Sequence, residues 1–135
     1  MRKLVVVYLI LAAALGTGAL QDPVGTKCPS LGIYPITTCL VTPFPPTSGQ
    51  PVSVSVTGTF TTDTYISQIR YSLQGQQNWN YQYTTFNLSY PSGLQQSFAY
   101  FLQIPQYHDS WLVQITVIGS DLVSVLGCWE FAFRD

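Results

Sequence analysis

The side chains that could carry out acid–base chemistry are few and scattered in this chain. The only histidine, His108, lies beside Asp109, and an adjacent carboxylate can orient an imidazole as a general base. The competing interpretation, which we favour, is an exposed loop histidine. Asp109 and Asp121 flank one expected strand and so lie at its opposite ends, unlike the paired carboxylates of glycoside hydrolases. No G-x-S-x-G or P-loop pattern occurs. We therefore expect no catalytic residues and no enzyme activity.

The three cysteines, Cys28, Cys39 and Cys128, lack the short spacing of a metal site, and no second histidine is present to complete one. We expect neither a metal nor a cofactor. In a secreted chain a disulfide is the default expectation, but three is an odd number. One thiol is therefore left over or pairs with another chain. A bond between Cys28 and Cys128 would tie the two ends of the domain together.

The first residues are typical of a secretory signal peptide. Met1-Arg2-Lys3 is positive, residues 4–15 are almost wholly apolar, and small residues follow up to Ala19. The apolar run is too short for a membrane-spanning helix, which needs about 20 residues. We expect a signal peptide over residues 1–19 and a single domain over residues 20–135.

Charged residues make up only 8% of the sequence, against about 25% in an average protein, and 47% is hydrophobic. This composition excludes a basic surface for nucleic acid. Asn87-Leu88-Ser89 is an N-glycosylation sequon in an expected loop, and its use is left open.

Short apolar runs with period-two alternation recur about every ten residues, with turn signals between them. Residues 51–60 are the clearest case, because Val52, Val54 and Val56 alternate with polar side chains. The pattern predicts seven strands, over residues 36–41, 51–60, 65–74, 79–86, 94–104, 111–119 and 123–133. Such spacing favours an all-β two-sheet sandwich over a barrel.

Within these strands we expect particular side chains to share one face. Tyr65, Ile69, Tyr71 and Leu73 are in phase in one strand, and the last strand has its own in-phase set of Val125, Trp129, Phe131 and Phe133. Aromatic residues make up 14% of the chain. They either fill a packed core or line a cavity between the sheets, and periodicity alone does not separate these readings.

Three segments carry a resemblance to a known family. Residues 41–60 read V-x-P-x-P-P-x-x-G-x-x-V-x-V-x-x-x-G-T-F, residues 102–105 read L-x-I-P, and Cys128-Trp129-Glu130-Phe131 closes the chain. In order and spacing they resemble the ML (lipid-recognition) domain family. The nearest branch is that of phosphatidylglycerol/phosphatidylinositol transfer proteins, which is related to the lysosomal sterol-carrying member.

The resemblance implies an immunoglobulin-like β-sandwich of about seven strands with a hydrophobic cavity between its sheets. It implies a non-enzymatic protein of the secretory route or the endolysosomal lumen. Such a protein is a monomer that contacts membranes transiently and binds and transfers a phospholipid or a sterol. It also implies a disulfide between Cys28 and Cys128, whereas the family's mid-chain cysteine pair is missing here and Cys39 has no evident partner. The expected lipid-binding residues are Val54, Val56, Phe60, Ile69, Tyr71, Leu73, Phe98, Tyr100, Leu102, Val117, Trp129 and Phe131.

An alternative of a different class stays open from the sequence. A secreted adhesion or receptor-binding β-sandwich with a solid core would show the same strand pattern and the same aromatic content.

Overall fold

The computed structural model describes residues 23–29 and 32–135, so the expected signal peptide over residues 1–19 lies outside the described residues. Within the described ranges, no helix has the length and hydropathy needed to cross a membrane. The described chain forms strands β1 (Thr26–Lys27), β2 (Ile36–Thr42), β3 (Pro51–Thr59), β4 (Thr64–Gln74), β5 (Trp79–Tyr90), β6 (Gln95–Gln103), β7 (Ser110–Ile118) and β8 (Val125–Arg134).

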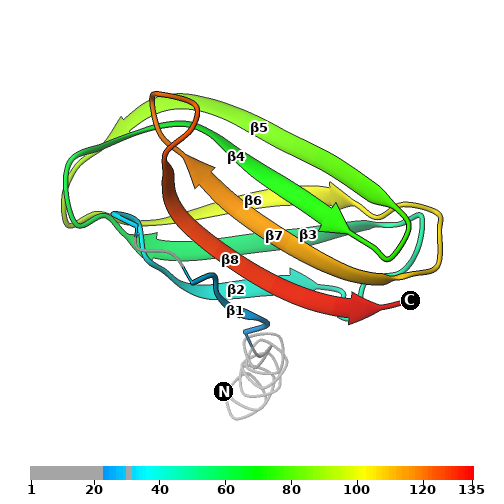
Figure 1. The fold of residues 1–135 in the computed structure, drawn as a ribbon. Coiled ribbons are helices and arrows are strands. Elements are labelled where there is room, and N and C mark those ends of the chain that lie inside the picture. Colours follow the sequence, from blue (N-terminus) through cyan, green and yellow to red (C-terminus); the bar gives the residue numbers. More distant parts are fainter. Residues whose placement is uncertain (1–22, 30–31) are drawn as a thin grey trace, which may run out of the picture.

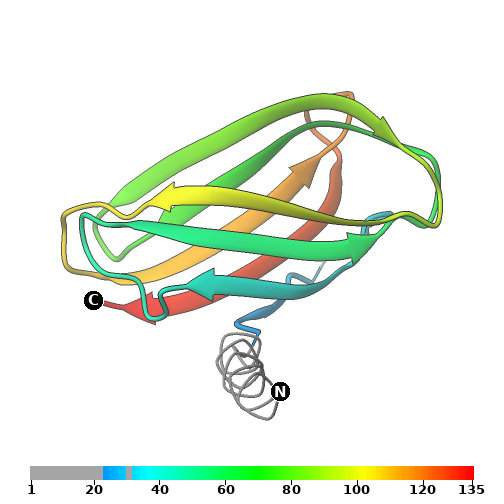
Figure 2. The same ribbon diagram turned by 180° about the vertical axis from the view of Figure 1, so that it is seen from behind.

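The strands form two antiparallel sheets that lie face to face (Figure 1). One sheet has five strands in the order β1-β8-β7-β4-β5, and the other has three in the order β2-β3-β6. Figure 2 shows the three-stranded sheet from the other side, with β5 running above β6. The predicted all-β, immunoglobulin-like sandwich is confirmed. Its seven long strands match the expected ones, and β1 is a short addition that pairs with β8.

Strand β3 follows the alternation of its sequence. Val52, Val54 and Val56 are buried against the other sheet, while the serines between them are half-buried on the outer face. The proline-rich turn before β3 contains cis bonds at Thr42–Pro43 and Phe44–Pro45. It closes at Gly49, whose φ of 72° suits glycine and whose N–H donates to the carbonyl of Ile104 at 3.0 Å.

Strand β5 is longer than expected, since it continues through Asn87 to Tyr90 instead of ending at residue 86. A β-bulge lies here, where Phe86 and Asn87 stand opposite Ser67 alone and Asn87 has a φ of 50°. Opposite this bulge the alternation of β4 is interrupted, because Ile66 and Ser67 are both buried. Tyr65, expected to point inward with Ile69, is therefore 40% exposed.

A second bulge, at Leu126 in β8, has the same effect. Val125 pairs with Ile118 and Gly127 with Val117, so Leu126 is the extra residue. The expected inward position of Val125 is wrong, since Val125 is exposed and Leu126 is buried. The carbonyl of Leu126 accepts a hydrogen bond from the N–H of Tyr34 at 2.8 Å. The bulge thus also fixes the segment that leads into β2.

The predicted disulfide is confirmed, because Cys28 and Cys128 are bonded and Cys39 is a free, buried cysteine. Cys128 pairs with Thr116 on the outer face of the five-stranded sheet. The bond therefore ties the N-terminal segment to β8 from outside the core.

Candidate functional site

The space between the two sheets is the candidate site. All twelve expected lipid-binding residues belong to the packed apolar interior, eleven of them buried and Tyr100 half-buried against the same cluster. No charged side chain is among the buried residues of the part of the chain that the structure describes. The two sheets therefore face each other with apolar and aromatic surfaces.

Two tyrosines, one from each sheet, stack on each other between the sheets, close to the β6 side. The rings of Tyr71 in β4 and Tyr100 in β6 stack with centroids 4.4 Å apart and an interplanar angle of 12°. Burial raises the pKa of Tyr71 well above its ordinary value, with smaller contributions from Tyr100 and Cys39. Burial also raises the pKa of the Cys39 thiol to about 12. Both groups are neutral at physiological pH, so the interior carries no charge from them.

One end of the interior is filled by an aromatic cluster. Phe60 lies between Tyr34 and Tyr90, with centroid distances of 4.6 and 5.0 Å. Phe98 contacts Phe86 at 5.0 Å and Tyr90 at 5.6 Å. Tyr34, Phe86 and Tyr90 are not among the residues expected at the site from the sequence. Tyr34 precedes the first expected strand and Tyr90 fell in an expected loop, whereas Phe86 is in phase with the polar Asn80, Gln82 and Thr84, so alternation gave no signal for it.

Strand β5 has its faces reversed relative to an ordinary amphipathic strand. Asn80, Gln82 and Thr84 are half-buried on the inward side, while Trp79 and Tyr81 are exposed on the other. The polar inward row lies where β5, an edge strand of one sheet, passes β6, an edge strand of the other. We call this side of the sandwich the β5–β6 edge.

At the β5–β6 edge, Gln82 joins the two sheets. Its Nε2 donates to the carbonyl of Gln103 at 2.7 Å, and its Oε1 accepts from the N–H of Gln103 at 2.9 Å. The hydroxyl of Tyr100 donates to the same Oε1 at 3.4 Å. The amide of Gln82 therefore takes the place of a neighbouring strand for one residue of β6. We call the two hydrogen bonds between the Gln82 side chain and the Gln103 backbone the Gln82 bridge.

The opposite side of the sandwich is covered by the N-terminal segment. The N–H of Val24 donates to the carbonyl of Cys39 at 2.9 Å, and the carbonyl of Val24 accepts from Nε1 of Trp129 at 2.7 Å. Trp129 thus holds the N-terminal segment in place through a hydrogen bond to its backbone.

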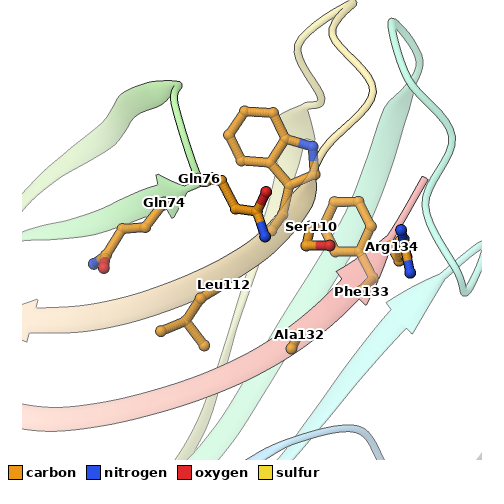
Figure 3. A pocket seen from close by; sticks show the side chains of 9 residues that line it. Gln74, Gln76, Ser110, Leu112, Ala132, Phe133 and Arg134 are labelled. Atoms are coloured by element: carbon orange, nitrogen blue, oxygen red, sulfur yellow. The ribbon is translucent and has the colours of Figure 1, made fainter.

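One surface depression lies outside this interior, on the outer face of the five-stranded sheet (Figure 3). It has a volume of about 590 Å³, and its lining includes Gln74, Leu112 and Ala132 from β4, β7 and β8, with Gln76 and Arg134 near one end. None of the four depressions found is lined by any of the twelve expected residues.

The loop around His108 does not have the geometry of a catalytic relay. Nδ1 of His108 lies 3.4 Å from Oγ of Ser48 and 3.8 Å from Oδ2 of Asp135. A serine nucleophile and an orienting carboxylate must use different ring nitrogens, but here both approach the same one. The side chain of His108 is 79% exposed. Asp109 instead accepts hydrogen bonds from the turn at Gln76.

Among the described residues, no three His, Cys, Asp or Glu side chains gather as a metal site would require. The arrangement that remains is an uncharged interior between two sheets, bridged at one edge by a neutral amide.

No protein-family model matches this chain, and no curated protein matches it significantly. Among solved structures, it is similar to a Niemann-Pick type C2 protein from the Japanese carpenter ant. The TM-score is 0.60, with 9% sequence identity, over 82% of this chain and 98% of the other. At this identity the likeness concerns the fold alone.

Proposed function

We propose that this protein binds one lipid, a phospholipid or a sterol, between its two sheets and carries it between membranes without covalent chemistry. The observation that carries the proposal is the uncharged, aromatic interior, whose walls come from both sheets and whose β5–β6 edge is bridged by the amide of Gln82. The expected lipid-binding residues are proposed to act as walls of this site.

The physical advantage of such an interior is large for a lipid. Each CH₂ group exposed to water costs about 0.8 kcal/mol, so a chain moving through water needs an apolar enclosure. An unpaired charge in that enclosure would cost several kcal/mol. The neutral state of Tyr71 and Cys39 therefore suits a lipid tail or a sterol ring system.

Two further findings support the proposal. The motifs in residues 41–60, 102–105 and 128–131 resemble the ML family, and the similar solved structure, a Niemann-Pick type C2 protein, belongs to that family. A disulfide fits an oxidising compartment, so we assign the protein to the secretory route or the endolysosomal lumen. We propose a monomer whose sequon at the exposed Asn87 is available for glycosylation.

A second candidate is a secreted adhesion or receptor-binding sandwich with a solid core. The close ring contacts favour it, since Tyr71 and Tyr100 stack at 4.4 Å and Phe60 and Tyr90 at 5.0 Å. In a lipid carrier these rings must move apart when the ligand enters. Tyr100 is the best placed to do so, because it is half-buried at the edge of β6.

Lipid extraction distinguishes the two candidates. The purified mature protein is extracted with organic solvent, the extract is analysed by mass spectrometry, and the stripped protein is titrated with fluorescent phospholipid and sterol analogues. A carrier releases a defined lipid and saturates at about one probe per chain, as expected for a single interior site. An empty extract together with no saturable binding of any apolar probe would refute lipid binding and support the adhesion candidate.

A further inference from the structure

The outward face of β5 carries a row of exposed aromatic side chains. Trp79, Tyr81 and Tyr83 are 57%, 61% and 64% exposed, and the rings of Trp79 and Tyr81 lie 5.4 Å apart. Strand β6 adds Phe101, which is 72% exposed on the outer face of the other sheet. We call these four side chains the aromatic rim.

The aromatic rim borders the β5–β6 edge from both sheets. Tyr81 and Tyr83 flank Gln82 in sequence, and Phe101 is two residues from Gln103, to which Gln82 is hydrogen-bonded. Side chains alternate along a strand, so the two tyrosines point away from Gln82 toward the outside. Exposed aromatic rings therefore stand on either side of the Gln82 bridge.

The same part of the chain is uncharged. No Asp, Glu, Lys or Arg occurs between Arg70 and Asp109, a run that includes all of β5 and β6. Edge strands usually carry charged side chains, especially lysine, which prevent pairing with other molecules. Two uncharged edge strands with exposed aromatic rings are the opposite of that protection. We infer that another surface covers this edge.

The charge pattern and the ring types indicate what that surface is. Tyr and Trp concentrate at the interface between lipid and water, where one end of the ring is apolar and the other is wet. Anionic membranes are bound through clusters of Lys and Arg, which this edge lacks. A flat sugar chain would need rings in a common plane, but Trp79 and Tyr81 are tilted by 57°. Arg70 pairs with Tyr83 across β4 and β5, but its guanidinium donates to the carbonyl of Leu122 at 3.1 Å.

We propose that the aromatic rim docks the β5–β6 edge onto neutral, zwitterionic membranes by inserting its rings among the headgroups. Docking in this orientation presents the Gln82 bridge and Tyr100 to the bilayer. The role of such docking in lipid transfer rests on the proposed function. A lipid would then pass between the bilayer and the interior with little of it exposed to water.

Trp79 provides a direct probe of docking. It is exposed, whereas Trp111 and Trp129 are 1% and 6% exposed. The mature protein is mixed with phosphatidylcholine vesicles, some of which contain brominated acyl chains. We expect a blue shift of Trp79 emission and quenching by the brominated lipid. Both should persist at about 1 M salt, where the Debye length is only about 3 Å.

Variants identify the residues responsible. The double variant Tyr81→Thr with Tyr83→Thr should lower vesicle partitioning by about tenfold, since two partly buried rings are lost. Phe101→Thr should weaken it by a smaller factor. Val123→Thr is the matched control, because Val123 is 77% exposed but lies in the turn between β7 and β8. All of these positions are exposed, and circular dichroism checks that each variant is folded.

Several outcomes would overturn the docking proposal. The first is that the double variant partitions to vesicles as well as the unmodified protein does. The second is that the protein binds only anionic vesicles and that salt abolishes this binding. The third is that the rim residues support self-association or polysaccharide binding while the protein does not bind vesicles. Uptake of a short-chain lipid probe without vesicles should be unchanged in the double variant. If that uptake is absent even in the unmodified protein while vesicle docking persists, the proposed lipid function fails and the docking surface stands.

Discussion

Tyr100 and Trp129 both line the interior, but their surroundings give them different roles. Tyr100 is half-buried, stacks on one ring and donates a long hydrogen bond to Gln82. Trp129 is buried, and its Nε1 donates to the backbone of Val24 at 2.7 Å. We therefore infer that Tyr100 can yield to a ligand, whereas Trp129 supports the structure.

We expect Tyr100→Ala and Trp129→Ala to differ in their effects on stability and on lipid affinity. Removal of a packed, buried aromatic ring costs about 3–5 kcal/mol, and Trp129→Ala should fall in that range. Tyr100→Ala should cost less and change the affinity for lipid. Urea unfolding and lipid titration of both stripped variants measure this. A large stability loss for Tyr100→Ala with unchanged lipid binding would place Tyr100 in a solid core.

Asp109 connects two loops at one end of the sandwich, and its effect should depend on pH. Its carboxylate accepts hydrogen bonds from the N–H groups of Gln76 and Ser110 and from the amide of Asn78. These bonds hold the pKa of Asp109 below its ordinary value, and the bond from the Gln76 N–H has the largest effect. Because the unfolded pKa is about 3.9, the stabilisation is present above about pH 4 and lost as pH falls through the folded pKa.

Asp109→Asn should therefore lower the melting temperature at neutral pH, and the difference from the unmodified protein should shrink in acid below about pH 4. Thermal melts over a pH series measure it, with Glu130→Gln on the outer face of β8 as the control for loss of one negative charge. If the difference in melting temperature stays constant down to strong acid, the negative charge of Asp109 does not stabilise the turn.

At the scale of strands, alternation predicted the seven long strands, and the bulges account for most of what it missed. The extra residue Leu126 reverses the phase of β8 at Val125. Opposite the bulge of β5, the alternation of β4 breaks between Ile66 and Ser67, which leaves Tyr65 exposed. No local sequence feature distinguishes such a residue from an ordinary strand residue. Asn87 was placed in a loop because Pro91 and Gly93 follow it, but the strand ladder to β4 continues past it.

The apolar interior was predictable from the sequence, but its β5–β6 edge was not. Of the twelve expected residues, all but Phe60 lie on strands whose inward phase is apolar, and Phe60 directly follows β3. In β5 the aromatic residues alternate just as regularly, yet they point outward. Which face of an edge strand is covered depends on the partner sheet, and here the inward position is taken by Gln82 because it bonds to β6. A single sequence does not contain that information.

We expect the Gln82 bridge to limit opening of the β5–β6 edge. Gln82→Met keeps the side-chain length and removes both hydrogen bonds to Gln103. The loss of about 1 kcal/mol of bonding should speed hydrogen exchange of the Gln103 amide by about fivefold and speed lipid uptake similarly. Hydrogen exchange and stopped-flow fluorescence measure the two rates. Thr84→Val, on the same inward face, is the control, and an unchanged Gln103 exchange rate would show that the bridge is not what holds the edge.

The two sides of the sandwich are held together differently. The N-terminal segment covers and crosslinks one side, whereas the Gln82 bridge joins the sheets at the β5–β6 edge. The N-terminal segment fastens the first side through the disulfide at Cys28, the bond of Val24 to Cys39 and the bond of Trp129 to Val24. On the other side, the Gln82 bridge joins two edge strands that carry no charge. A ligand entering between the sheets would meet least resistance at the β5–β6 edge, where the aromatic rim also lies.

The disulfide should therefore account for much of the stability of the molecule. It closes a loop with a sequence separation of 100 residues, and the loss of a crosslink of this length costs about 4–5 kcal/mol in the chain-entropy model. Domains of this size are stable by only about 5–15 kcal/mol. The paired variant Cys28→Ser with Cys128→Ser should thus unfold at much lower urea concentration, because the N-terminal segment is no longer held against β8.

Cys39→Ala serves as the control, since Cys39 is fully buried and unbonded and its replacement leaves the crosslink intact. In the native protein no thiol should react with an aromatic disulfide reagent, because burial excludes the reagent and raises the Cys39 pKa to about 12. In denaturant without reductant, one thiol per chain should react. A peptide map that finds Cys39 in a disulfide, or a stability loss below about 1 kcal/mol for the paired variant, would contradict this account, since the chain-entropy model requires several times that loss.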